Sequence, residues 1–222
     1  MNFVCVLRQD PATKKHPGFY DKEWVNKLRN GVKRNYSKPF NFVCLSNVET
    51  DVETIPLESD FTNWWAKLEI FRPNLFTGPV TYLDLDIVLC NNFTNIFDSL
   101  DTTKFYMIKE PGNNPNSSIM HFQGDYSHLY TNAVKNKEFI TAKYSKGKNL
   151  GDQGYISDNI KHEFLNGTEN QSFQFKHHKI QTQISNPKFL IFISKHQKPS
   201  NNQNLQLVKD NWKDLINKKY KG

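Results

Sequence analysis

Two short apolar runs, separated by a segment with helical periodicity, open the chain. Residues 2–7 (NFVCVL) and 39–46 (PFNFVCLS) are almost wholly apolar, as strands that are covered on both faces are. Between them, apolar residues recur at helical spacing from Tyr20 to about Lys33. A strand, a helix and a strand in this order predict a mainly parallel sheet flanked by helices, which is an α/β fold.

The remaining residues continue this alternation of strands and helices. We expect a helix at 63–71, capped by Asp60 or Thr62, and a strand from Val80 to about Leu85. Further strands are expected at 104–110, 119–122, 173–177 and 188–194, a short extended piece at 55–57, and helices at about 126–137 and 207–216. The 222 residues are enough for one domain with a sizeable core, so we expect a single domain over residues 1–222.

The formal net charge of +7 favours anionic partners, namely a nucleotide, a nucleic acid or an anionic membrane surface. The basic residues are spread along the chain and no recognition motif is found, so we expect no nucleic-acid partner. No segment approaches the roughly 20 apolar residues of a membrane span, although peripheral contact with a membrane is compatible with the charge. We expect a cytoplasmic protein with buried, reduced thiols at Cys5, Cys44 and Cys90.

Two carboxylates, Asp84 and Asp86, interrupt the apolar run TYLDLDIVLC. Residues separated by one position on a strand point to the same side, and burying both carboxylates in ionised form without a partner would be costly. A hard divalent cation, Mg²⁺ or Mn²⁺, would satisfy them, because it takes oxygen ligands and keeps positions for phosphate oxygens and water. In the alternative interpretation, Asp86 only caps the following turn and Asp84 pairs with a lysine.

An Asp-x-Asp after an apolar strand occurs in two classes of enzyme. In haloacid-dehalogenase-type phosphatases the first carboxylate is the nucleophile, but that strand usually opens the fold and Gly-Thr usually follows. Here Ile87 and Val88 follow, and the strand lies mid-chain behind two others. The position is better matched by metal-dependent glycosyltransferases, in which the carboxylates hold a divalent metal on the diphosphate of a nucleotide sugar.

A broader resemblance covers nearly the whole chain. Residues 64–97 (WWAKLEIFRPNLFTGPVTYLDLDIVLCNNFTNIF) resemble the segment of GT-A glycosyltransferases that carries Trp-x-Lys on a helix, then a strand and Leu-Asp-x-Asp. Further matches follow in the family's order at 44–46 (CLS), 116–120 (NSSIM), 151–153 (GDQ) and 196–199 (HQKP). The chain is similar to the retaining enzymes around glycogenin and the bacterial lipopolysaccharide galactosyltransferases. The resemblance implies the GT-A (Rossmann-like) fold.

The resemblance implies metal and diphosphate binding at Asp84, Leu85 and Asp86, with Asp84 alternatively turned toward the ribose or sugar. His196 would be the third protein ligand of the metal; a surface histidine is the alternative. Lys198 would contact the diphosphate and help the leaving group to depart. Gln197 stands where the family has Gly, so the local sequence departs from the family pattern.

The resemblance also implies contacts to the nucleotide and the sugar. The end of the opening strand would contact the base and ribose through Val6, Leu7 and Arg8. Lys67 would reach the phosphates or the donor sugar, unless it is a solvated helix lysine. Sugar hydroxyls would be bound by Ser117 and Ser118, although turn chemistry accounts equally well for these residues.

Asp152 and Gln153 would line the donor sugar as the catalytic residues. In a retaining enzyme, front-face attack needs little beyond positioning and charge neutralisation; in an inverting enzyme, Asp152 would be the base. A helix N-cap is the alternative role for Asp152. We expect Trp64 and Trp65 to belong mostly to the core, with stacking of one of them on a sugar as the alternative.

The implied function is a metal-dependent transfer of a hexose from a nucleotide-diphosphate sugar, expected to be UDP-linked, to a glycan, lipid-linked or protein acceptor, with retention and with Mn²⁺ or Mg²⁺ as cofactor. The nucleotide-binding part would comprise about residues 1–110 and the acceptor and closing part about residues 111–222. The alternative is a non-catalytic carbohydrate- or nucleotide-sugar-binding module on the same fold, for which the altered residues 196–199 would be the evidence.

Overall fold

A seven-stranded sheet forms the centre of the protein. The structure, a computed structural model, describes residues 1–10, 20–147, 150–165, 172–176, 184–193 and 197–213. The strand order is β3-β2-β1-β4-β7-β6-β8. Its strands are β1 (Asn2–Leu7), β2 (Asn41–Ser46), β3 (Glu53–Pro56), β4 (Val80–Leu83), β6 (Phe105–Lys109), β7 (Pro115–Phe122) and β8 (His162–Phe164). All of them run in one direction except β7, which pairs antiparallel with β4 and β6. The mainly parallel sheet is as predicted.

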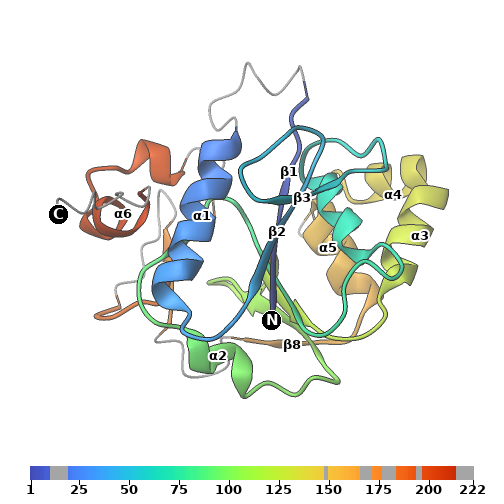
Figure 1. Cartoon of the computed structure of the whole chain (residues 1–222). Helices are drawn as coiled ribbons and strands as arrows, with labels where there is room; N and C mark the ends of the chain where they lie inside the picture. The colour runs from blue at the N-terminus through green and yellow to red at the C-terminus, as the bar shows by residue number, and fades with distance from the viewer. Residues whose placement is uncertain (11–19, 148–149, 166–171, 177–183, 194–196, 214–222) are drawn as a thin grey trace.

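Helices cover both faces of this sheet, as Figure 1 shows: α1 lies on one side of β1 and β2, and α3, α4 and α5 lie on the other. The helices are α1 (Lys22–Asn35), the 3₁₀ helix η2 (Asn63–Phe71), α2 (Thr94–Asp98), α3 (Ser127–Lys135), α4 (Lys137–Lys143), α5 (Gly151–Asn159), the 3₁₀ helix η3 (Pro199–Asn201) and α6 (Gln206–Asn211). A smaller sheet has the order β5-β10-β9 and contains β5 (Val88–Leu89), β9 (Phe173–Lys176) and β10 (Phe189–Phe192). No described helix has the length and apolar character that crossing a membrane requires.

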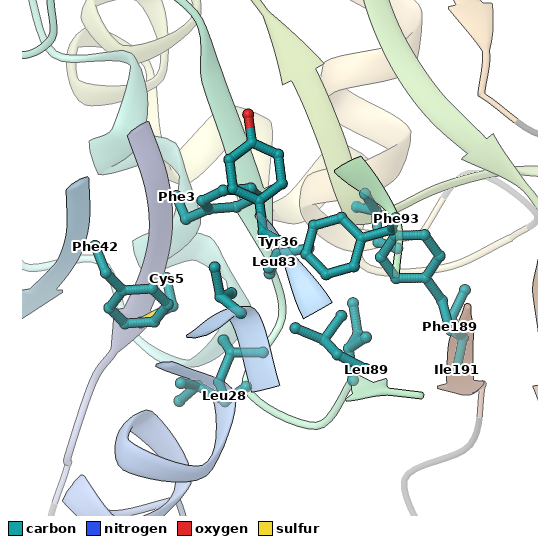
Figure 2. Close-up of a cluster of buried hydrophobic side chains, with 14 of the residues drawn as sticks. Phe3, Cys5, Leu28, Tyr36, Phe42, Leu83, Leu89, Phe93, Phe189 and Ile191 are labelled. Atoms are coloured by element: carbon teal, nitrogen blue, oxygen red, sulfur yellow. The ribbon is translucent and has the colours of Figure 1, made fainter. Parts of the chain in front are cut away.

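The core consists of a large hydrophobic cluster on each face of the sheet. Along β1, Phe3 and Cys5 belong to the cluster under α1, and Val4 belongs to the cluster under η2 and α5. Figure 2 shows part of the first cluster, in which the rings of Tyr36 and Phe93 stack with centroids 5.7 Å apart. Burial on both faces explains why the strands are apolar at nearly every position. The three cysteines are buried and free, as expected.

Three predicted elements differ from those observed. Strand β4 ends at Leu83 rather than Leu85, because the chain turns there and the Ile87 N–H donates to the Asp84 carbonyl at 3.3 Å. The helix expected at 126–137 is divided at Asn136 into α3 and α4. The closing helix ends at Asn211, and residues 214–222 lie outside the described part of the chain.

The helix at 63–71 is present, but it is a 3₁₀ helix, and the predicted cap is wrong. Thr62 occupies the N-cap position without a side-chain hydrogen bond. Asp60 pairs instead with Lys137, with 2.6 Å between Oδ1 and Nζ. The start of η2 is therefore fixed by packing and not by a capping side chain.

His121 on β7 is a buried titratable group in the sheet. Its Nδ1 lies 2.8 Å from the Thr81 hydroxyl oxygen, and its ring stacks on Phe97. Burial lowers the pKa of His121 to about 4 from an ordinary value of 6.5. The His121 imidazole is neutral in the folded protein, and it takes up a proton at a higher pH when the chain is unfolded. The free energy of unfolding is therefore unaffected by this group above about pH 6.5 and decreases as the pH falls toward 4.

We expect His121→Gln to reduce the acid sensitivity of folding. The histidine accounts for a loss of about 2–3 kcal/mol in the free energy of unfolding between pH 7 and pH 4.5. Urea denaturation at both pH values should give a decrease that is smaller by about this amount in the variant than in the wild type. Carboxylates titrate in both proteins and cancel in this difference, so equal decreases would contradict the assignment.

Candidate active site

The carboxyl edge of the sheet gathers the predicted site residues at the point where the strand order reverses. The chain passes from β1 to β2 and β3 on one side, whereas β4 lies on the other side of β1. In open α/β sheets, ligands bind beyond the carboxyl ends of the strands at such a point. Arg8 follows β1, and Asp84 and Asp86 follow β4. The two aspartates thus lie on the turn after the strand, and not on the strand as predicted.

Lys67 on η2 joins two carboxylates that are distant in the sequence. Its Nζ lies 3.1 Å from Asp84 Oδ1 and 2.9 Å from Asp152 Oδ2. It also donates to the Ser117 hydroxyl oxygen at 2.9 Å, and that hydroxyl donates to Asp152 Oδ2 at 2.7 Å. We call Lys67, Asp84, Ser117 and Asp152 the Lys67 network. Lys67 is only 6% exposed, so the alternative of a solvated helix lysine is wrong.

Two members of the Lys67 network, Lys67 and Asp84, remain ionised despite their burial. Desolvation by itself would lower the pKa of Lys67, but the Asp152 and Asp84 carboxylates raise it above its ordinary value. Burial favours the neutral form of Asp84, yet the Lys67 ammonium and the Tyr82 hydroxyl hold the pKa of this carboxyl below its ordinary range. The Tyr82 hydroxyl donates to Asp84 Oδ1 at 2.6 Å. Asp84 therefore presents a carboxylate, with one of its oxygens engaged by two donors.

Asp86 has a second lysine as its partner. Lys198 Nζ donates to Asp86 Oδ2, and the Tyr20 hydroxyl donates to the same oxygen at 3.0 Å. The Lys198 ammonium also lies 5.5 Å from the centroid of the Tyr20 ring. Burial raises the pKa of Tyr20, and the charges of Asp86 and Asp84 raise it further, so the phenol keeps its proton. Of the alternative interpretation, the pairing of Asp84 with a lysine is observed. The Asp86 side chain also pairs with a lysine, whereas the alternative had it only cap the following turn.

Tyr20 is a site residue that the sequence interpretation missed. It was expected only as the first residue of a helix, but it lies just before α1 and donates a hydrogen bond to Asp86. Tyr82 was likewise expected only as a strand residue. Its position two residues before Asp84 is the signal that could have identified it, because residues i and i+2 share a face of an extended chain.

The fit of a divalent metal rests on the two aspartates. The charges of Asp84 and Asp86 both raise the pKa of Tyr20, so both carboxylates lie near its hydroxyl. They supply the hard oxygen ligands that Mg²⁺ and Mn²⁺ prefer. His196, the predicted third ligand, lies outside the described residues. Within the part of the chain that the structure describes, no group of three or more His, Cys, Asp or Glu side chains is placed to hold a metal. The described residues thus offer a metal two carboxylates, and metal binding at them stays a prediction.

Ser117 and Ser118, which were predicted to bind sugar hydroxyls, form hydrogen bonds with the aspartates of the site. Both hydrogen-bonding roles of the Ser117 hydroxyl are filled within the Lys67 network. The Ser118 carbonyl accepts from the Asp84 N–H at 2.8 Å, and the Ser118 side chain also bonds to Asp84. Both residues belong to β7, whose antiparallel direction brings its start to the carboxyl edge of the sheet. In the described structure they position the site carboxylates.

The residues predicted to contact the nucleotide differ in exposure. Leu7 and Leu85 are buried in the core, so only their main-chain atoms could meet a ligand. Val6 is half-buried. Arg8 pairs with Asp10 at 2.7 Å between Nε and Oδ1 and donates to the Ser59 carbonyl at 3.3 Å. Arg8 is therefore the polar side chain at the end of β1.

Asp152 and Gln153 lie in the first turn of α5. The helix begins at Gly151 and its N-cap position is Leu150, so the N-cap alternative for Asp152 is wrong. The Asp152 side chain is turned toward Lys67 and Ser117 instead, and Gln153 is half-buried beside it. A carboxylate in the first turn of a helix is also stabilised by the helix dipole.

The two neighbouring tryptophans of η2 differ. Trp65 is 8% exposed and packs near Tyr155, as expected of a core residue. Trp64 is 54% exposed, so the expectation of a core position is wrong for this residue. Trp65 aligns with Leu68 and Phe71 of the 3₁₀ helix, which are in the core. Trp64 belongs to the exposed residues 62–64 at the start of η2, and every residue of η2 after it is buried.

A pocket of 540 Å³ lies away from these residues, at the amino edge of the parallel strands. It is lined by residues from the start of β6, β8 and the end of α5, among them Phe105, Tyr126 and His162. None of the predicted site residues lines it. The pocket therefore does not belong to the candidate active site.

Comparisons with known proteins identify the fold. No protein-family model and no curated protein matches the sequence. Solved structures do match: an active-site mutant of LgtC superposes with a TM-score of 0.62 at 10% identity over 95% of this chain and 93% of that chain. The galactosyltransferase LgtC in complex with donor and acceptor sugar analogs gives a TM-score of 0.60 at 11% identity over 96% and 97%. The chain has the GT-A fold.

A third GT-A structure extends this result. The apo form of the glycosyltransferase GlyE from Streptococcus pneumoniae TIGR4 superposes with a TM-score of 0.61 at 16% identity, over 95% of this chain and 59% of that chain. The predicted GT-A fold is thereby confirmed. One fold supports many activities, so the function of this GT-A chain is argued from its site.

Proposed function

We propose that this protein is a metal-dependent glycosyltransferase that moves a hexose from a nucleotide-diphosphate sugar, with UDP-hexose as the expected donor, to a glycan, lipid-linked or protein acceptor with retention. The observation that carries the proposal is the Lys67 network, which places Asp84 and Asp152 on one ammonium at the switch point of a GT-A sheet. Positioned charges of this kind suit a reaction in which a diphosphate departs.

In this proposal Asp84 and Asp86 hold Mn²⁺ or Mg²⁺, with His196 as the third ligand. When bound, the metal supplies charge neutralisation to the diphosphate. Lys198, which pairs with Asp86, contacts the same diphosphate. Arg8 and the main chain of β1 contact the nucleotide. In this arrangement the carboxylates bind the metal, and the cationic side chains at the carboxyl edge bind the anionic donor.

Asp152 and Gln153 line the donor sugar. Lys67 and Ser117 fix the Asp152 carboxylate in position, because both bond to its Oδ2 atom. A carboxylate held in this way has little rotational freedom, so it can orient a hydroxyl or stabilise positive charge at the anomeric carbon. Front-face transfer needs little more from the protein than this positioning. The division into a nucleotide-binding part and an acceptor part, and a cytoplasmic location, stay predictions.

One observation favours a second candidate, a non-catalytic nucleotide-sugar-binding module on the same fold. Each carboxylate of the Asp-x-Asp already has a lysine partner, so both charges are compensated without a metal. Binding of a nucleotide sugar without release of free nucleotide over hours, with Mn²⁺ present, would support this candidate over the enzyme.

A thermal-shift panel tests the proposal. We expect UDP-glucose, UDP-galactose or GDP-mannose to raise the melting temperature when Mn²⁺ or Mg²⁺ is present and much less when it is removed by a chelator. A ligand at about 100 times its Kd stabilises by about 2.7 kcal/mol, or roughly 5–10 °C for a chain of this size. AMP, which lacks a diphosphate, is the control. No shift with any nucleotide diphosphate under either metal would contradict the proposal.

A further inference from the structure

Trp64 is an exposed aromatic side chain that the proposed roles do not use. Among the described residues, four large hydrophobic side chains are exposed: Trp64, Val134, Phe139 and Leu150. Two of these lie together, because Leu150 precedes Gly151 and the main chain at Gly151 touches the Trp64 indole. Exposed apolar surface grouped beside a polar site is characteristic of ligand contact.

Two main-chain positions with left-handed conformation, Asn63 and Gly151, lie next to Trp64. Asn63, directly before it, has a φ of 53°, and Gly151 has a φ of 67°, both in the left-handed region. A Cβ atom at Gly151 would lie 2.7 Å from Trp64 Nε1, so the indole packs where a side chain would otherwise be. Asparagine and glycine adopt this region readily, so both positions are turns that the local sequence permits.

This indole lies directly outside the Lys67 network. In a 3₁₀ helix residues three apart share a side, so Trp64 and Lys67 lie on the same side of η2. Both side chains meet the start of α5: the indole packs on Gly151, and the Lys67 ammonium binds the next residue, Asp152. The exposed Trp64 indole and the Lys67 ammonium thus contact two consecutive residues of α5, Gly151 and Asp152.

This combination matches the chemistry of a pyranose ring, which has an apolar face of C–H groups and a rim of hydroxyls. A tryptophan π-face packs on the C–H groups, and charged or amide side chains bind the rim. We propose that Trp64, with Leu150 and Gly151 beside it, is a stacking platform for a pyranose ring bound next to Asp152. This inference depends on the proposed function only for the identity of the sugar, which is the donor hexose or the terminal residue of the acceptor.

The test compares Trp64→Leu, which keeps an apolar side chain without the π-face, with the wild type. Phe139→Leu is the matched control, because Phe139 is exposed on α4 outside the site. Calorimetry with Mn²⁺ measures the Kd of UDP and of UDP-hexose, and ligand-observed NMR, which does not depend on Trp64 as a reporter, measures binding of lactose, maltose and methyl galactoside. A Trp64→Phe variant should retain much of the effect, since it keeps an aromatic face.

A donor platform predicts that Trp64→Leu weakens UDP-hexose roughly tenfold and leaves UDP unchanged. An acceptor platform predicts an unchanged UDP-hexose affinity and a similar loss of saccharide binding. Equal weakening of UDP and UDP-hexose would show contact with the nucleotide and overturn the proposal, as would unchanged binding of every probe. A wild type that binds no nucleotide diphosphate contradicts the proposed function, whereas the saccharide measurements still decide the platform.

Discussion

Lys67→Met is expected to lower the free energy of unfolding by about 3–5 kcal/mol, the usual cost of removing one partner from a buried ion pair. The methionine keeps the length of the side chain but leaves the Asp152 and Asp84 carboxylates without their shared ammonium. The Ser117 hydroxyl also loses its donor. Urea denaturation at pH 7 measures the change, and donor binding should be lost together with the stability.

The matched control for this variant is Lys104→Met. Lys104 pairs with Glu163 at 3.5 Å, with both side chains about half exposed, so its loss should change stability by less than about 1 kcal/mol. The double variant Lys67→Met/Asp152→Asn should be more stable than Lys67→Met, because one uncompensated carboxylate is removed. A Lys67→Met protein as stable as the wild type would show that the network carries no buried charge.

Asp86→Asn is expected to weaken Mn²⁺-dependent binding of UDP by more than about 100-fold. Loss of residues that only support a metal ligand costs about 10–100-fold, and loss of a ligand's charge costs at least as much. The substitution keeps the shape of the side chain but leaves Lys198 without its carboxylate partner, so the melting temperature without ligand should fall, and the affinity is measured at a temperature at which the variant is folded. Titration calorimetry of UDP with and without Mn²⁺ gives the affinity.

Asp101→Asn serves as the control for this measurement. Asp101 is exposed between α2 and β6, at the amino edge and far from the site in the sheet. Its substitution should leave UDP affinity unchanged. If Asp86→Asn binds UDP and Mn²⁺ as the wild type does, Asp86 is not a metal ligand and its carboxylate serves only to pair with Lys198.

The central strands β1, β2 and β4 could be predicted from sequence because they are buried on both faces, whereas the partly exposed β8 was not predicted. Phe3 and Val4 enter different hydrophobic clusters, and this leaves an apolar run that periodicity analysis detects. The end of β4 could not be placed, because the residues after it are equally apolar and the turn depends on the bond from Ile87 to Asp84. Local composition carries no information about that bond.

The site was predicted as a set of positions but not as a set of partners. Lys67 is 50 residues from Ser117 and 85 residues from Asp152 along the chain. It contacts them only when η2, β7 and α5 have packed together, so no local sequence pattern predicts these contacts. Trp64 was misplaced for a different reason. Periodicity does not show at which residue burial begins, and residues 62–64 at the start of η2 are exposed whereas residues 65–71 are buried.

The position of β7 has a consequence for how the protein acquires its site. β7 is formed by residues 115–122, yet it lies between β4 and β6 inside the sheet. A growing chain that has reached residue 110 therefore presents β4 as an open, apolar edge, which favours association with other chains. The Lys67 network is completed only when Asp152 has been synthesised and packed. Along the growing chain, β7 thus becomes available to close this edge before α5 becomes available to complete the site.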